Sequence, residues 1–165
     1  MTTDIPLLTF SPITEKQIKE YITWRWEPPY DIYTEDPANT AEIIDYYLDP
    51  QFQTHAITDQ KGSLVGLCSF GPDGRVPGGR YLHDALDIGL AIRPDLTGKG
   101  KGHTYIQAVV AYAQQQHPPA LRVTIAEFNR RAQRVWQKNG FVQVERFARQ
   151  SDGMLFLVFI YLNDQ

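Results

Sequence analysis

The sequence predicts one α/β domain of the mixed-sheet (α+β) type over residues 1–165, with six to seven central strands and helices on both faces. Strand-like and helix-like segments interleave in the order βααββ(loop)βαβαββ, which is typical of a sheet covered by helices. Hairpin patterns occur at both ends of the chain, so antiparallel pairs are expected beside parallel ones. The composition, 42% hydrophobic and 21% charged, is that of an ordinary globular protein.

In the first half of the chain, capping and breaking residues delimit the elements. Thr14 and Gln17 form a capping-box pattern that begins a helix, and Pro28 with Pro29 must end it. An Asn-Thr pair caps a second helix, and an Asp-Gln-Lys-Gly turn joins two strand-like runs as a hairpin. The expected elements are a strand over 7–13, helices over 15–25 and 41–48, strands over 54–58 and 63–70, and a glycine-rich loop over 71–84.

In the second half, the apolar residues are patterned more regularly. The apolar run 85–93 predicts a central strand, which Pro94 ends because proline cannot donate to a sheet. Asn129 is placed to cap the last helix, and Asn139-Gly140 is a helix-stop signal. The remaining expected elements are a helix over 104–116 and strands over 121–125, 141–147 and 154–162.

Charge and composition argue against several classes of protein. A net charge of −3 does not suit a protein that coats nucleic acid or an anionic membrane. The longest apolar run, 154–162, is far shorter than the roughly 20 residues that span a bilayer. A single cysteine, Cys68, and a first segment without a signal-peptide pattern predict a cytoplasmic protein. Cys68 itself is expected to be a small buried strand residue. The histidines show no metal-ligand spacing, so no metal is expected.

The most informative stretch is 92–102, Ile-Arg-Pro-Asp-Leu-Thr-Gly-Lys-Gly-Lys-Gly, which follows a strand and opens a helix. Its alternate glycines, Gly98, Gly100 and Gly102, leave the main-chain amides unshielded at the positive end of the helix. Such a turn suits a phosphate or pyrophosphate, and Lys99 and Lys101 add positive charge. The alternative interpretation is a glycine-rich connector with solvated lysines.

Two common phosphate-binding motifs do not fit this loop. A Walker A loop needs a glycine five residues before its Gly-Lys pair, where this chain has Arg93 or Asp95, and it needs Ser or Thr after the lysine. A dinucleotide fingerprint needs a third glycine where this chain has His103. The loop therefore belongs to neither class.

Taken with the Asn129 helix, the glycine loop resembles the GNAT superfamily of N-acetyltransferases. The family's central motif is a strand, Pro, Arg/Gln-Gly-x-Gly-x-Gly/Ala and a helix, and Pro94 with the three glycines matches it. Asp87-Ile88-Gly89-Leu90 is also similar to a strand of the ribosomal-protein N-terminal acetyltransferase branch. The family's next block is Asn, Ala three residues on, an aromatic residue and Gly-Phe, matched here by Asn129, Ala132, Trp136, Gly140 and Phe141.

The resemblance implies an enzyme that uses acetyl-CoA and no metal. In the family, amides of the glycine loop hold the pyrophosphate, and the pantetheine arm runs along the strand before the loop. That strand splays from the next one, here 121–125, and a main-chain amide in it can polarise the thioester carbonyl. The residues expected at acetyl-CoA are Leu90, Ala91, Ile92, Thr97, Gly98, Lys99, Gly100, Lys101, Gly102, His103, Asn129 and Trp136.

Two positions depart from the family pattern. Thr97 stands where the family has Arg or Gln, so one phosphate contact is lost or comes instead from Lys99, Lys101 or the Thr97 hydroxyl. Trp136 stands where the family commonly has Tyr to protonate the departing thiolate, and an indole is not a useful general acid. Water would then serve, or no acid is needed, since a thiol with a pKa of about 8.5 is a tolerable leaving group.

The acceptor amine must lose a proton, and a carboxylate is the usual base. Asp87 and Glu127 are the first candidates, Asp87 foremost because a mostly apolar central strand tolerates an acid poorly without a reason. The alternatives are a salt bridge for Asp87 and a solvated position for Glu127. The stretch that carries Trp26, Glu27, Tyr30 and Tyr33 is expected to form a wall of the acceptor pocket, with Glu27 as a third candidate base, or else to pack the first helix on the sheet. The irregular stretch 70–81 is expected to supply another wall.

The sequence thus predicts an N-acetyltransferase that moves an acetyl group from acetyl-CoA to a primary amine of a small molecule, a protein N-terminus or a lysine, by direct attack. One alternative is a catalytically weak acyl-CoA-binding regulatory domain of the same fold, which Thr97 and Trp136 favour. Another is a nucleotide phosphate site, which predicts that ATP rather than coenzyme A stabilises the protein. No pattern in the sequence identifies the acceptor amine, and the sequence leaves open whether the chain forms a homodimer.

Overall fold

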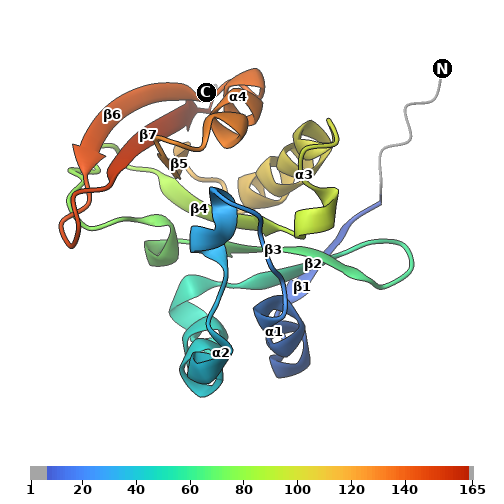
Figure 1. Cartoon of the computed structure of the whole chain (residues 1–165). Coiled ribbons are helices and arrows are strands. Elements are labelled where there is room, and N and C mark those ends of the chain that lie inside the picture. The colour runs from blue at the N-terminus through green and yellow to red at the C-terminus, as the bar shows by residue number, and fades with distance from the viewer. Residues whose placement is uncertain (1–6, 164–165) are drawn as a thin grey trace.

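The computed structural model describes residues 7–163, which form one mixed sheet of seven strands with helices on both faces (Figure 1). The strand order is β1-β2-β3-β4-β5-β7-β6. Strands β4 and β5 are parallel neighbours, and all the other neighbouring pairs are antiparallel. The predicted fold class is confirmed. Within the described residues, no helix is both long and apolar enough to cross a membrane.

The elements follow the predicted order, with short 3₁₀ turns inserted in the loops. The strands are β1 (Thr9–Pro12), β2 (His55–Thr58), β3 (Leu64–Phe70), β4 (Leu86–Ile92), β5 (Ala120–Ala126), β6 (Val142–Ala148) and β7 (Leu155–Leu162). The helices are α1 (Glu15–Ile22), α2 (Thr40–Leu48), α3 (Gly102–Gln114) and α4 (Arg130–Lys138). The 3₁₀ turns are η1 (Tyr30–Tyr33), η2 (Pro37–Asn39), η3 (Pro50–Phe52), η4 (Pro72–Gly74) and η5 (Pro94–Leu96).

Local side-chain bonds explain the boundaries of the first helix. The Thr14 hydroxyl accepts from the Gln17 amide at 3.3 Å, and the Gln17 side chain accepts from the Thr14 amide at 3.0 Å. The predicted capping box is therefore confirmed. Helix α1 ends at Ile22 rather than at residue 25, and the Arg25 guanidinium donates to the free carbonyl of Ile22 at 2.8 Å. A side chain thus satisfies a carbonyl that the helix itself leaves unpaired.

The sheet separates two layers of helices (Figure 1). Helices α1 and α2 cover one face, where Ile18 and Ile44 belong to a buried cluster with Leu67 of β3. Helices α3 and α4 cover the other face, where Val109 and Trp136 belong to a larger buried cluster. Successive residues of a strand point to opposite faces, so β4 contributes side chains to both layers.

Strands β4 and β5 are paired only at their first residues. Their register is Leu86 with Leu121 and Asp87 with Arg122, and no further pair is formed within the described residues. After these two pairs the strands diverge as a fork that opens toward their carboxyl ends. The carboxyl ends of parallel strands are where open α/β sheets bind their ligands.

A buried ion pair lies at the last paired position of the fork. Arg122 donates through Nε and Nη2 to the two carboxylate oxygens of Asp87, each at 2.7 Å, and both side chains are buried. Arg75 adds a third bond to the carboxylate at 2.9 Å, and Arg122 Nη1 donates to the carbonyl of His83 at 2.8 Å. A buried pair compensates for its desolvation only when it is bonded as fully as this.

Breaking the pair from one side should destabilise the protein. Asp87→Asn leaves the Arg122 guanidinium buried without a counter-charge, and we expect it to lower the free energy of unfolding by about 3–5 kcal/mol, measured by urea denaturation. The double variant Asp87→Leu/Arg122→Met removes both charges and should recover much of that loss. The exposed Asp45→Asn is the control for the loss of one negative charge. A loss below about 1 kcal/mol for Asp87→Asn would show that the pair is not structural.

Candidate active site

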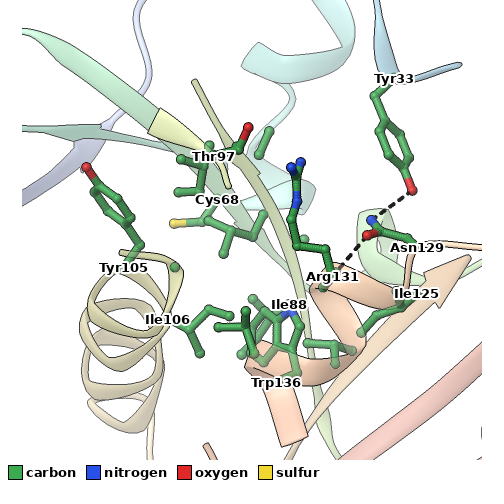
Figure 2. Close-up of a pocket in the computed structure, with 18 of the residues that line it drawn as sticks. Tyr33, Cys68, Ile88, Thr97, Tyr105, Ile106, Ile125, Asn129, Arg131 and Trp136 are labelled. Atoms are coloured by element: carbon green, nitrogen blue, oxygen red, sulfur yellow. Dashed lines mark hydrogen bonds between the residues drawn. The ribbon is translucent and has the colours of Figure 1, made fainter. Parts of the chain in front are cut away.

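The fork opens into a cavity of about 770 Å³ (Figure 2). It is bordered by the glycine loop, the start of α3, strands β4 and β5, and aromatic side chains of α1, η1 and α2. The segment η1 lines this cavity with Tyr30 and Tyr33, whose side chains contact Arg131 and Asn129 at the start of α4. Residues from all parts of the chain therefore meet around one continuous space.

The glycine loop is built to receive an anion. Gly98 and Gly100 have left-handed backbone conformations, with φ of 72° and 75°, which favour glycine. The main-chain N–H groups from Gly98 to His103 donate to no other group within residues 7–163. They lie at the N-terminus of the 13-residue helix α3, where the helix dipole is positive. Free amides in that position form a phosphate cradle.

Arg131 brings a guanidinium to this cradle from the first turn of α4 (Figure 2). Its Nη1 lies 3.0 Å from the point where a Cβ would stand on Gly98, so a side chain at Gly98 would meet it. The same guanidinium lies over the ring of Tyr30, 4.3 Å from the ring centroid. A cation held by an aromatic face beside free amides adds to the attraction for an anion.

The cations predicted at the loop do not line the cavity. Lys99 and Lys101 are exposed and are not among the described lining residues. The Thr97 hydroxyl donates to the carbonyl of Pro94 at 2.7 Å, so its proton is already engaged. Sequence reasoning missed Arg131 because it lies in the Asn129 helix, where the pattern indicated only a cap and an apolar stripe. Arg131 is far from the glycines in the sequence, so no local pattern showed that they are close in space.

Asn129 and Trp136 take the positions that the sequence predicted for them. Asn129 Oδ1 accepts from the amide of Ala132 at 3.1 Å and caps α4, while its Nδ2 donates to the Tyr33 hydroxyl at 3.3 Å (Figure 2). Trp136 lines the cavity from α4 and is buried against Phe141, with ring centroids 4.9 Å apart. The cap therefore also ties η1 to α4 across the cavity.

Comparison with known proteins identifies the family. The family model described as an acetyltransferase (GNAT) domain matches residues 3–142. The chain belongs to the GNAT acetyltransferase family. Its enzyme class is that of the acyltransferases, and acetyl-CoA is its acyl donor. No curated protein sequence matches the chain significantly, and the comparisons give no support to the ribosomal-protein branch.

Solved structures of other GNAT proteins share the fold. A chimera of spermidine N-acetyltransferase from Vibrio cholerae and hSSAT superposes with a TM-score of 0.72 at 19% identity, covering 94% of this chain and 95% of that one. The Vibrio cholerae spermidine N-acetyltransferase in complex with CoA and spermine gives 0.65 at 17% identity, covering 94% and 95%. A putative acetyltransferase from Acinetobacter baylyi gives 0.65 at 16% identity, covering 99% and 96%. At these identities the likeness shows the fold alone.

The donor half of the cavity fits the acyl donor of a GNAT enzyme. Free amides and Arg131 offer a site for a pyrophosphate, and the open fork leaves main-chain groups of β4 without a β5 partner. Within residues 7–163, no three His, Cys, Asp or Glu side chains are grouped to hold a metal. The predicted acetyl-CoA residues that line the cavity are Leu90, Ala91, Ile92, Thr97, Gly98, Gly100, Gly102, His103, Asn129 and Trp136.

Aromatic and acidic side chains also line the cavity. Of the residues predicted for the acceptor pocket, Trp26, Tyr30 and Tyr33 line the cavity, and Glu27 is not among the described lining residues. The stretch 70–81, predicted as a second wall, contributes Asp73 to the lining, and the structure adds four side chains that the sequence did not reveal, namely Tyr21, Glu35, Tyr47 and Ser69. These five side chains come from α1, α2, β3 and two loops, and no local pattern could have placed them together.

The two acids favoured as general bases are both held by arginines. Asp87 faces Arg122 and Arg75, so the acid in the apolar strand is explained by an ion pair rather than by catalysis. Glu127 pairs with Arg146 at 2.6 Å, which lowers the pKa of Glu127. Neither is among the described residues that line the cavity. Both carboxylates are therefore engaged by arginines, whereas Glu35 and Asp73 line the cavity.

Closing the phosphate cradle should weaken the donor site selectively. A valine at Gly100 would be strained at φ 75° and would add a branched side chain beside the free amides. We expect Gly100→Val to weaken acetyl-CoA binding at least tenfold, about 1.4 kcal/mol, measured by calorimetric titration.

The matched control for that substitution is Gly62→Val. Gly62 has φ 79°, open space around its Cβ position, and a place in the β2–β3 turn. It should suffer the same backbone strain with no change in acetyl-CoA affinity. Unchanged affinity in a folded Gly100→Val protein would remove the glycine loop from the donor site.

Proposed function

We propose that this GNAT enzyme acetylates a primary amino group of an organic cation that carries more than one amine, by direct attack on acetyl-CoA. The observation that carries the proposal is the continuity of the cavity, which joins the phosphate cradle to an aromatic, acidic acceptor half through the fork. A donor and an acceptor bound in one such space need no covalent relay. A cytoplasmic location, which the sequence predicts, stays part of the proposal.

Electrostatics supports a cationic acceptor. Glu35 lies in the cavity wall, and its Oε1 accepts from the Tyr47 hydroxyl at 3.4 Å. Burial and the nearby negative charge of Asp73 raise the pKa of Glu35, although the hydrogen bond from Tyr47 lowers it in part. A bound cation would relieve both effects by supplying a counter-charge. Binding of a positively charged amine in the cavity would therefore be electrostatically favourable.

Aromatic rings strengthen the case for a cation. Trp26 and Tyr47 both pack edge-on against Tyr21, with ring centroids 6.2 Å and 5.6 Å from that of Tyr21. All three residues line the cavity. Aromatic faces attract ammonium groups by roughly 0.5–2 kcal/mol each. The spermidine N-acetyltransferases that share the fold act on amines of this kind, as their names state. These points together favour a diamine or polyamine over a neutral acceptor.

Direct attack is supported by the state of the cysteine in the cavity. Cys68 lines the cavity but is 1% exposed, and burial raises the pKa of its thiol to about 12. At neutral pH it remains a thiol, and the thiolate is the nucleophilic form. An acetyl-cysteine intermediate is therefore disfavoured, which leaves the amine as the group that attacks the thioester.

A regulatory domain that binds acyl-CoA without turnover is the second candidate function. Trp136 favours it, because this buried indole occupies the place where the family commonly has a tyrosine acid. The two functions differ in whether coenzyme A is released from bound acetyl-CoA.

An assay of free thiol with acetyl-CoA and a panel of amines tests the proposed function. The panel contains spermidine, putrescine, a lysine-containing peptide with a blocked N-terminus, and a peptide with a free N-terminus. We expect amine-dependent release of coenzyme A, fastest with spermidine or putrescine, because these place a second cation near Glu35. Tight binding of acetyl-CoA with no release for any amine would favour the regulatory domain.

Removing the thiol should not stop the reaction. Cys68→Ala is expected to keep kcat within a few-fold of the unmodified protein, because the neutral thiol takes no part in the transfer. Intact mass spectrometry of the enzyme mixed with acetyl-CoA alone should show no acetylated protein. A stoichiometric acetyl adduct that Cys68→Ala abolishes would replace direct attack by a two-step transfer.

A further inference from the structure

We infer that Asp73 is the catalytic base of this acetyltransferase, the carboxylate that takes the proton from the acceptor ammonium group. The inference rests on the proposed function and deepens it, since the roles first assigned to Asp87 and Glu127 do not fit their ion pairs. Asp73 lies in η4, after β3, and lines the cavity beside Ile88 and Gly89 of β4.

The turn that carries Asp73 is fixed to the fork strand. The Gly71 amide donates to the carbonyl of Asp87 at 2.9 Å. Gly74 packs so closely on β4 that a Cβ there would lie 3.0 Å from Asp87 Cβ and 3.3 Å from the main chain of Ile88. The ion pair that closes the fork and the turn that holds Asp73 therefore share one residue, Asp87. This places Asp73 near the closed end of the fork.

Glycine at position 89 leaves room for the carboxylate. A Cβ on Gly89 would lie 2.4 Å from Ser69 Oγ and 3.2 Å from Asp73 Oδ2. Ser69 is the cross-strand partner of Gly89, and its hydroxyl donates to Asp73 Oδ2 at 2.5 Å. The Tyr46 hydroxyl donates to the other oxygen, Oδ1. Two hydroxyl donors thus fix the carboxylate over β4, and each oxygen keeps a lone pair for a further bond.

Within residues 7–163, no arginine forms an ion pair with Asp73, whereas arginines pair with Asp87 and Glu127. Arg75, at the end of the same turn, donates to Asp87 instead. The ionisable groups that face Asp73 are Tyr46 and Tyr47 of α2, Tyr21 of α1, and Glu35. Burial raises the pKa of all three tyrosines, that of Tyr21 to about 12, so they stay neutral donors through the working range of the enzyme.

Asp73 and Glu35 are suited to different amino groups of the acceptor. Glu35 follows η1 and bonds to Tyr47 at the aromatic wall, so it suits the distant charge of a diamine. Asp73 lies against the fork strand, where the resemblance to the family places the thioester. A diamine can therefore present one ammonium to Glu35 and the reacting one to Asp73.

The proposed step balances in protons and bonds. An N–H bond of the acceptor ammonium breaks, and its proton bonds to an oxygen of Asp73. The freed nitrogen lone pair forms a C–N bond to the thioester carbonyl carbon, and the C–S bond breaks as coenzyme A leaves as a thiolate. A second N–H proton neutralises that thiolate, and Asp73 later returns its proton to water. No oxidant or further reactant is required.

Asp73→Asn, assayed against pH, tests the assignment. The acceptor is the amine of the panel that the unmodified enzyme acetylates fastest. At pH 7 we expect kcat/KM to fall about 100-fold or more, the usual scale of general base catalysis. The neutral fraction of an alkyl amine with a pKa of about 10.4 rises roughly tenfold per pH unit. By pH 9.5 the ratio of the two enzymes should therefore shrink to less than about tenfold.

The controls separate catalysis from folding and from donor binding. Asp73→Asn should bind acetyl-CoA as tightly as the unmodified enzyme, and its thermal midpoint should stay within a few degrees. Asp45→Asn removes an exposed carboxylate from the helix that carries Tyr46 and should leave kcat/KM unchanged.

Each contrary result has a distinct meaning. An unmodified enzyme that releases no thiol with any amine would overturn the proposed function, and this inference with it. If the unmodified enzyme is active and kcat/KM of Asp73→Asn at pH 7 is within threefold of its value, the inference alone is overturned. A deficit that is the same at every pH would show that Asp73 positions the acceptor without taking its proton, which also contradicts the assignment.

Discussion

The buried ion pair between Asp87 and Arg122 is the constraint on which this active site depends. It joins β4 to β5 at the last register pair before the two parallel strands diverge. A sheet that continued to pair would have no slot, and one that did not pair at all would have no fixed fork. The pair is buried and bonded through both carboxylate oxygens, and the strands diverge directly after it.

The other parts of the site are arranged around that fork. At the open end, β4 leads into the glycine loop, and Arg131 approaches the loop from α4. At the closed end, the turn η4 is bonded to the main chain of Asp87 and places a carboxylate over Gly89. Strand β4 thus borders both the glycine loop and the turn that carries Asp73, the carboxylate that we propose as the catalytic base.

Sequence reasoning recovered what local patterns encode. The capped helix at Asn129, the glycine loop, the capping box at Thr14 and the order of elements follow from spacing between near neighbours. The partners of Asp87 and Gly89 did not follow, because they meet through space. Arg122 alternates with the apolar residues of β5, a pattern that predicts a side chain facing solvent, but it is buried. Asp73 lies in the stretch 70–81, which the sequence predicts as a loop and as a second wall of the acceptor pocket, but no local pattern distinguishes its carboxylate.

A crystal structure of the protein with coenzyme A would show whether the fork receives the acyl donor. We expect the diphosphate against the free amides between Gly98 and His103, and the pantetheine arm between β4 and β5 beyond the Asp87–Arg122 pair. Coenzyme A bound elsewhere, with the fork between the two strands filled by side chains, would show that the fork is not the donor site.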